Sequence, residues 1–290
     1  MKRKKSRFLT YAVLALFALY MVLPVLSTIL YALSTKWSNT ILPRDLTLSW
    51  FAELFSDASF ISAVARSLAL TLTTVAVVLI VMVPTVFLTY MYFPRIDRFM
   101  SGLVLMPYAI PGVILATGLL KMYAGTALPM YIVLVGGLFI SALPFMYQGV
   151  RNSLESIQTR QLMEASELLG AGRTRTFMEI IVPNIKLGLL VTTLLIFSVF
   201  FGEFVLTNLM LGGRFETIRI YMLRRMNENG HLASAVMLIY FLLLMMISLY
   251  ITYITSRKKV KKKPAVHVQT WLGTANQNKE GAVNELHHNQ

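Results

Sequence analysis

The side chains of this chain that could do chemistry are few. There are no cysteines, which excludes disulfides, thiolate metal sites and cysteine nucleophiles. The sequence contains no Gly-x-x-x-x-Gly-Lys phosphate loop, no His-Glu-x-x-His and no Gly-x-Ser-x-Gly. Three of the four histidines lie beyond residue 264, and the fourth, His231, stands alone at the start of an apolar segment. We therefore expect no enzymatic activity, no cofactor and no metal site.

Two polar features remain as candidates for function. Glu203 is the acidic residue deepest inside an apolar segment. A carboxylate inside a membrane is costly and usually faces a cavity or a partner. Glu203 could therefore lie on a path that favours a cation, or it could pair with a neighbouring helix or another subunit. The second feature is the longest polar stretch between apolar segments, residues 151–182.

The composition places most of the chain in lipid. Hydrophobic residues make up 56% of the 290 residues and charged residues 14%, with a mean hydropathy of +0.65. A soluble domain of this length would carry roughly a quarter charged residues. The net charge of +14 comes mainly from Lys and Arg beside the apolar segments. No basic stripe interleaved with aromatics is present, so we expect no nucleic-acid partner.

Six apolar segments are long enough to cross a bilayer, and they predict an all-α integral membrane protein with six transmembrane helices. The first follows a basic N-terminus, residues 1–7, and is too long for a cleaved signal of about 7–15 apolar residues. Residues 34–60 should form an external loop, and residues 256–290 a basic, disordered tail. The remaining 61–255 form the core. The predicted spans are 8–33, 61–92, 99–123, 129–149, 183–211 and 232–255.

Prolines inside these segments predict local distortions. Pro107 and Pro111 should break or bend the third span, and the fourth should be interrupted near Pro144. Basic residues place both termini in the cytoplasm. Arg214, Arg219, Arg224 and Arg225 fall in a predicted external loop. They either argue against this orientation or indicate that the loop packs on protein.

The polar stretch 151–182 predicts a short helix over residues 159–170. Leu162, Ala165 and Leu168 or Leu169 fall on one stripe at helical spacing, and Arg160 can pair with Glu164. Gly170 and Gly172 permit a positive φ and thus a sharp turn. Pro183 suits the first turn of the next span. Periodicity alone is equally consistent with a helix that merely lies on the membrane surface.

The spacing within this stretch carries a resemblance. Glu164-Ala165-Ser166, three residues, Gly170, nine residues and then Ile180-x-Val182-Pro183 resemble the cytoplasmic loop of permease subunits of binding-protein-dependent ABC importers. The family pattern has Ala where Ser166 stands and Leu where Val182 stands. The loop also lies between the fourth and fifth spans, as in that family.

The resemblance implies a type I importer permease with a MetI-like transmembrane domain in a bacterial plasma membrane. The implied partners are ABC ATPase subunits, a second permease that is homologous or identical, and an external solute-binding protein. The loop would form a coupling helix seated in the ATPase, with Glu164 pairing to a basic group and Gly170 making the turn. Ala165 and Ser166 would give close contact, Arg173 would be a polar anchor, and Pro183 would begin the next span.

A narrower resemblance concerns the substrate. Chain length, Pro107-Tyr108-x-x-Pro111-Gly112 and Phe201-Gly202-Glu203-Phe204 look most like the polyamine, ferric-iron and phosphonate permeases. This implies a translocation pathway near Pro107, Tyr108, Pro111 and Glu203, with a polyamine as first substrate. Ferric iron, phosphonate or another small solute are alternatives. Rival classes are an ion-gradient-driven secondary transporter, which should have ionisable residues in several spans, and a membrane scaffold protein.

Overall fold

The computed structural model describes residues 2–37, 40, 42–43 and 45–257. Those residues are mostly helical, and the part up to Ile251 forms one compact unit, to which the sites below belong. Within the described ranges the only extended pairing is an isolated bridge between Ser34 and Leu46. The predicted tail at 256–290 lies outside the described residues except for its first two positions.

The described helices match the predicted six-span membrane protein. Five runs are each long and apolar enough to cross a bilayer, and one bent pair makes a sixth. The bent pair consists of Pro94–Ala109 and Gly112–Tyr123, at 93° to each other. The five runs are α1 (Lys2–Leu33), α3 (Ala58–Tyr92), α6 (Met130–Ser156), α8–η2–α9 (Arg173–Phe201) and α12 (Gly230–Arg257).

The bent span confirms the predicted effect of its two prolines. Helix α4 (Pro94–Leu103) is followed by the short 3-10 turn η1 (Met106–Ala109), which contains Pro107. Pro111 then caps α5 (Gly112–Tyr123) in an extended conformation. Each proline lacks the N–H that would continue the hydrogen-bond ladder, so the helix restarts in a new direction.

The predicted interruption at Pro144 is wrong, because α6 runs unbroken through it. Pro144 is buried, and α6 packs along both α3 and α9. A proline in a membrane helix removes only one ladder hydrogen bond, and neighbouring helices can hold the segment in register.

The fifth span also differs from its predicted limits of 183–211. The helical run begins earlier, with α8 (Arg173–Thr176) and the π turn η2 (Phe177–Ile181), and α9 (Val182–Phe201) ends at Gly202. Pro183 lies in the first turn of α9, where its missing N–H follows the π turn. A separate helix, α10 (Val205–Met210), starts after a three-residue break.

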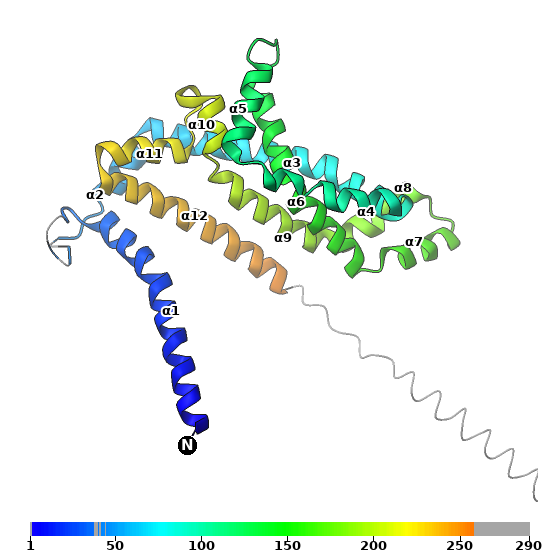
Figure 1. Cartoon of the computed structure of the whole chain (residues 1–290), viewed down its shortest axis with the longest axis horizontal. Helices are drawn as coiled ribbons and strands as arrows, with labels where there is room; N and C mark the ends of the chain where they lie inside the picture. The colour runs from blue at the N-terminus through cyan, green and yellow to red at the C-terminus, as the bar shows by residue number, and fades with distance from the viewer. Residues whose placement is uncertain (1, 38–39, 41, 44, 258–290) are drawn as a thin grey trace, which may run out of the picture. The chain divides into compact units, whose positions relative to one another are not determined.

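The core lies where α3, α6 and α9 run side by side (Figure 1). Small residues bring α6 and α9 close together. A Cβ added at Gly149 would collide with Thr192, and one added at Gly188 would collide with Ser153. Membrane helices pack by such close backbone approach because lipid offers no hydrophobic drive between them.

A second cluster joins the ends of α1 and α12 to α2 (Ser49–Ser56), α3 and α11 (Ile218–Glu228). Its largest fully buried side chains include Phe60, Phe201 and Tyr221. Helix α11 lies in the segment predicted as an external loop, and its inner face is buried. The loop therefore packs on protein, which was one of the two alternatives left open by its arginines. Helix α1 is exposed over residues 10–27, which suits contact with lipid or another subunit.

Candidate functional site

Helix α7 (Thr159–Leu168) occupies the polar stretch that the sequence singled out. Its buried side chains are Thr159, Met163 and Ser166, spaced so that they share one face. Thr159 Oγ1 donates to the Leu154 carbonyl at 2.6 Å, at the end of α6. The Ser166 and Thr176 hydroxyls lie 3.0 Å apart, which ties α7 to α8. This inward face therefore fixes α7 to both adjoining spans.

The exposed side of α7 is mixed in character. Its exposed polar residues are Arg160, Gln161, Glu164 and Glu167, and its exposed apolar residue Leu168 is followed by Leu169 just after the helix. Leu168 and Leu169 are 89% and 88% exposed, and Glu164 and Ala165 are also exposed. The residues of the predicted stripe therefore differ in environment: Leu162 is half-buried against the core, whereas Leu168 and Leu169 are exposed. Tertiary contacts through Thr159, Met163 and Ser166 orient the helix, and these two leucines remain outside.

Ser166 does not share the outward face with Ala165. It is buried and donates to the Met163 carbonyl at 2.8 Å in addition to its contact with Thr176. The serine thus fills a polar position inside the loop, where the family's alanine could not make these hydrogen bonds. This contradicts close contact with a partner through Ser166.

The turn after α7 follows the prediction at one glycine and not at the other. Gly170 has a φ of 81°, and the Ala171 N–H donates to the Ser166 carbonyl at 3.0 Å. Gly172 has a φ of −69° and precedes α8 in an extended conformation. Of these two glycines, only Gly170 therefore has a backbone conformation that favours a residue without a Cβ.

The charged side chains of the loop pair differently from the expected Arg160–Glu164 contact. Within the described part of the chain, no ion pair joins those two residues. Arg173 Nε lies 3.3 Å from Glu167 Oε1, and its guanidinium carbon lies 5.2 Å from the centre of the Tyr92 ring. These contacts join Arg173 to α7 and α3.

A buried polar cluster fastens α4 to α6 near this loop. Tyr147 donates its hydroxyl to a carboxylate oxygen of Asp97 and to the Asp97 carbonyl. Arg151 Nε donates to the other oxygen at 3.2 Å. A buried carboxylate needs such partners, because an unpaired charge is expensive to desolvate.

The predicted pathway residues lie at two helix breaks, with Pro107, Tyr108 and Pro111 before α5 and Glu203 before α10. A Cβ added at Gly112 would lie 3.6 Å from side-chain atoms of Val205 and Leu206, so α5 and α10 are in contact just after each break. Tyr108 is exposed, and its ring meets Phe145 edge-on with centres 5.5 Å apart. Pro107 and Pro111 set the bend and leave Tyr108 outside the core.

Glu203 caps the start of α10. Its two oxygens accept the backbone N–H groups of Leu206 and Thr207 at 2.7 and 2.9 Å, and also the Thr207 hydroxyl. It thereby satisfies donors left free at the start of α10, where the helix dipole favours a negative charge. The side chain is partly buried and pairs with neither an adjacent span nor a cation among the residues described.

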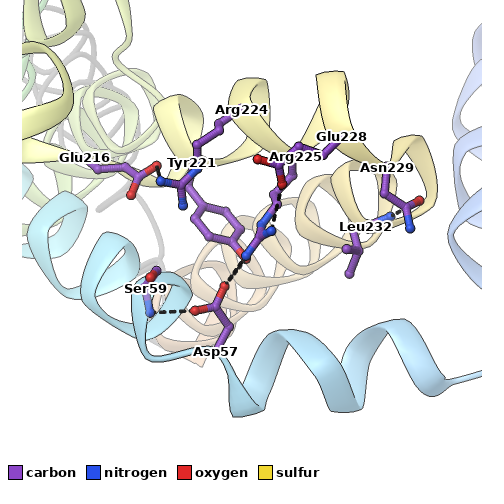
Figure 2. Close-up of polar contacts among 9 residues, drawn as sticks. All are labelled: Asp57, Ser59, Glu216, Tyr221, Arg224, Arg225, Glu228, Asn229 and Leu232. Atoms are coloured by element: carbon purple, nitrogen blue, oxygen red, sulfur yellow. Dashed lines mark hydrogen bonds and ion pairs between the residues drawn. The ribbon is translucent and has the colours of Figure 1, made fainter.

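A further polar cluster, missed from the sequence, joins α11 to the start of α3 (Figure 2). Asp57 Oδ2 accepts from the Tyr221 hydroxyl at 2.7 Å and from Arg225 at 2.6 Å. Arg225 also donates to Glu228 at 2.8 Å, and Ser59 N–H donates to Asp57 Oδ1. We call Asp57, Tyr221 and Arg225 the α11 clamp. Only the run of arginines in this segment hinted at it.

Hydrogen bonds set the charge states of the clamp. Burial alone would raise the pKa of Asp57, but the donors Tyr221, Arg225 and Ser59 outweigh it and lower the pKa to about 2. Burial, together with the hydrogen bond to Asp57, raises the pKa of Tyr221 to about 12. The clamp is therefore a carboxylate, a neutral phenol and a guanidinium at neutral pH.

Residues 83–261 match the family model described as "Binding-protein-dependent transport system inner membrane component". A methionine ABC transporter structure, MetNI in an inward-facing conformation, is 19% identical, with a TM-score of 0.58 over 73% of this chain and 99% of the other. A bacterial ABC transporter for the acidic polysaccharide alginate is 15% identical, with a TM-score of 0.67 over 89% and 99%. Another structure of a bacterial alginate ABC transporter, in complex with an alginate pentasaccharide-bound periplasmic protein, is 16% identical, with a TM-score of 0.63 over 88% and 96%.

No group of three or more metal-ligating side chains that could hold an ion occurs among the residues described. The arrangement offers a mechanical connection: α7 is tied to α6 and α8, and α8 continues into α9, whose far end is the break at Gly202.

Proposed function

Since the chain belongs to the family of binding-protein-dependent transport system inner membrane components, we propose that the outward face of α7 docks onto an ATPase subunit that powers solute import. The chain is a multi-pass ABC permease subunit and a transport component. In this proposal it catalyses no reaction itself, and ATP hydrolysis belongs to its partner.

The observation that carries the proposal is the pair Leu168 and Leu169. Both are almost fully exposed on a helix that is otherwise held firmly in place. Burial of a leucine contributes ~1.5–3 kcal/mol, so an aqueous protein partner would gain from covering them. Glu164 on the same exposed side offers a charge for a basic group of that partner. Ala165 leaves room for close approach.

The connections of α7 make it suitable for transmitting movement. Its inward face is bonded to the end of α6 through Thr159 and to α8 through Ser166. Helix α8 continues into α9, and Pro183 begins that span. Closure of the ATPase would therefore move α6 and α9 as a rigid body, which is one of the usual forms of conformational coupling.

The remaining partners follow from the same proposal. A second permease, homologous or identical, would complete the pathway, and the exposed helix α1 offers surface for it. An external solute-binding protein would deliver the substrate. The similar alginate transporter, with its periplasmic protein, supports this kind of partner. Both termini would lie in the cytoplasm, at the plasma membrane of a bacterium.

The substrate is the most specific part of the proposal. A polyamine is the first class to test, with ferric iron and phosphonate as alternatives. The carboxylate that favoured a cation, Glu203, is engaged by the start of α10. Substrate choice would then rest chiefly on the binding protein and on uncharged surface such as Tyr108.

The test compares variants at the docking face with a matched control. Glu164→Lys and the double change Leu168→Ser with Leu169→Ser should abolish co-purification of the ATPase and ATP-driven uptake, with normal membrane insertion. Leu42→Ser is the control, because Leu42 is 68% exposed but lies in the predicted external segment. It should leave both readouts unchanged.

Two results would overturn the proposal. The first is full uptake by the α7 variants. The second is solute uptake into proteoliposomes by this chain alone, under an ion gradient and without an ATPase, which would instead support a secondary transporter.

A further inference from the structure

A groove of about 670 Å³ lies between the end of α3 and the start of the α8–η2–α9 run. Its α3 wall includes Pro84, Leu88 and Tyr92, and its other wall includes Arg173, Phe177 and Met178. It is separate from the outward face of α7 and from the helix breaks near Glu203. The docking of an ATPase on α7 does not require it.

The groove extends along a membrane span. From Pro84 to Tyr92 the helix advances ~12 Å at ~1.5 Å per residue, and all of this length belongs to α3. Leu88 is 47% exposed and Met178 is 60% exposed, so both walls present apolar surface to the outside. A subunit confined to the aqueous phase would not reach along this depth.

A cation stands at the polar end of the groove. Arg173 lies over the Tyr92 ring at 5.2 Å, and its Nε contacts Glu167. Its Nε makes the hydrogen bond to Glu167, and no hydrogen bond of its two terminal nitrogens is found among the residues that the structure describes. A guanidinium with free N–H groups in a fork matches phosphate oxygens well.

Tyr92 adds a second sign of a missing acceptor. Its hydroxyl is enclosed and has no hydrogen-bond partner within the described residues. A buried hydroxyl left without a partner costs ~1–3 kcal/mol. A phosphate or ester oxygen at this end of the groove would supply the acceptor after a small side-chain movement.

We propose that this groove binds one anionic glycerophospholipid, with an acyl chain along Pro84, Leu88 and Met178 and its phosphate at Arg173. The apolar length at membrane depth and the single cation at its end match the two parts of such a lipid. Basic pockets between spans on the cytoplasmic side commonly hold anionic head groups. The proposal rests on the proposed function only for the choice of leaflet.

The experiment uses the full chain in detergent micelles and measures retained lipid by native mass spectrometry. Phosphatidylglycerol is compared with phosphatidylcholine of the same acyl chains. The native chain should retain the anionic lipid about five-fold better, which is the effect of one basic side chain near an anionic surface. Arg173→Gln should abolish this preference, and Leu88→Trp, which fills the groove, should lower retention of the first bound lipid several-fold.

Arg175→Gln is the matched control. Arg175 lies two residues along the same helix, its side chain is 72% exposed, and it pairs with Glu179 outside the groove. Equal retention of the two lipids by the native chain would overturn the proposal, as would an equal loss in Arg175→Gln. If Leu88→Trp retains lipid but prevents assembly with the second permease, the groove is a protein interface and the proposal is wrong. The readout contains no ATPase, so its failure is distinguishable from failure of the α7 proposal.

Discussion

Removing the charge of Asp57 should release α11 from the start of α3. In the α11 clamp the Asp57 carboxylate receives the Tyr221 hydroxyl and the Arg225 guanidinium. Asp57→Asn keeps the side-chain shape but loses the charge that holds Arg225. It therefore leaves a cation of low exposure without its main counter-ion, which is the costly way to break an ion pair.

The magnitude follows from the pKa of Asp57. Its ordinary value of 3.8 falls to about 2 when the clamp is formed. A difference of one in pKa corresponds to ~1.4 kcal/mol. The clamped state therefore gains about 2 kcal/mol from the ionised carboxylate, or about 30-fold in an opening equilibrium. A lowered pKa gives stability that is complete above pH 3.8 and is lost as the pH falls through about 2.

Hydrogen–deuterium exchange on the full chain in nanodiscs measures this directly. Amides of α11 should exchange up to about 30-fold faster in Asp57→Asn at neutral pH, because local opening sets their protection. Amides in the middle of α6 should be unaffected. The control is Glu228→Gln, since Glu228 also pairs with Arg225 but its side chain is 52% exposed. An exposed pair contributes little, so α11 protection should barely change.

The reasoning would be refuted by unchanged α11 protection in Asp57→Asn. It would also be refuted if Glu228→Gln accelerated exchange as much as Asp57→Asn, because the clamp would then depend on net charge rather than on the buried carboxylate. Acidification offers a second check on the native chain. Protection of α11, corrected for intrinsic rates, should fall between pH 4 and 2 and not between pH 7 and 5.

Three further predictions concern the helix breaks, the turn and the core. Glu203→Ala should lower stability by ~1–2 kcal/mol, the usual cost of losing a helix cap, without changing the relative uptake of cationic and neutral solutes; a selective loss of cation uptake would contradict the capping role. Gly170→Ala should reduce ATP-driven uptake because a φ of 81° costs a residue with a Cβ ~1 kcal/mol, whereas Gly102→Ala, where space is open, should have no effect on uptake; equal effects would argue against the turn. Gly188→Leu should lower the thermal midpoint because overpacking costs ~1–3 kcal/mol, while Gly136→Leu, with free space around it, should not; an unchanged midpoint in Gly188→Leu would mean that α6 and α9 can separate.

The number and approximate position of the spans could be predicted because lipid imposes a simple rule. A span needs about 20 apolar residues, and such a run can be recognised from the local composition. The break at Pro107 and Pro111 was equally local, since a missing N–H acts on its own helix. Pro144 has the same chemistry and yet leaves α6 unbroken. The difference lies in the packing of α6 between α3 and α9, which no short window of sequence contains.

The orientation of α7 shows the same limit. Its existence and the turn at Gly170 followed from spacing and from glycine's freedom at positive φ. Periodicity placed Leu162, Ala165 and Leu168 or Leu169 on one stripe, but it did not indicate which way that stripe faces. The structure buries Thr159 and Ser166, since both hydroxyls find partners on α6 and α8. Leu168 is exposed while two hydroxyl side chains are buried, so hydrophobicity alone cannot identify the inward side of this helix.

The sequence predicted that Glu203 needs a partner but left open which partner it has. A carboxylate inside a span does require a compensating partner, and the sequence offered a substrate, another helix or another subunit. The partner is the chain's own backbone, four residues away at most. Glu203 can cap α10 only because α9 ends at Gly202. In turn, the cap stabilises the start of the new helix after that end. The acid and the break therefore explain each other, and substrate charge is not needed to account for either.

The position of this break affects how movement would pass through the chain. The break after Gly202 lies against the break before Gly112, since α10 packs on α5. Helix α9 joins the first break to α8 and, through the bonds of Ser166, to α7. Movement imposed on α7 would thus pass along one continuous helical run and arrive where two short helices meet. A broken helix with its donors already capped can pivot there without exposing unpaired backbone groups to lipid, which an unbroken span could not do.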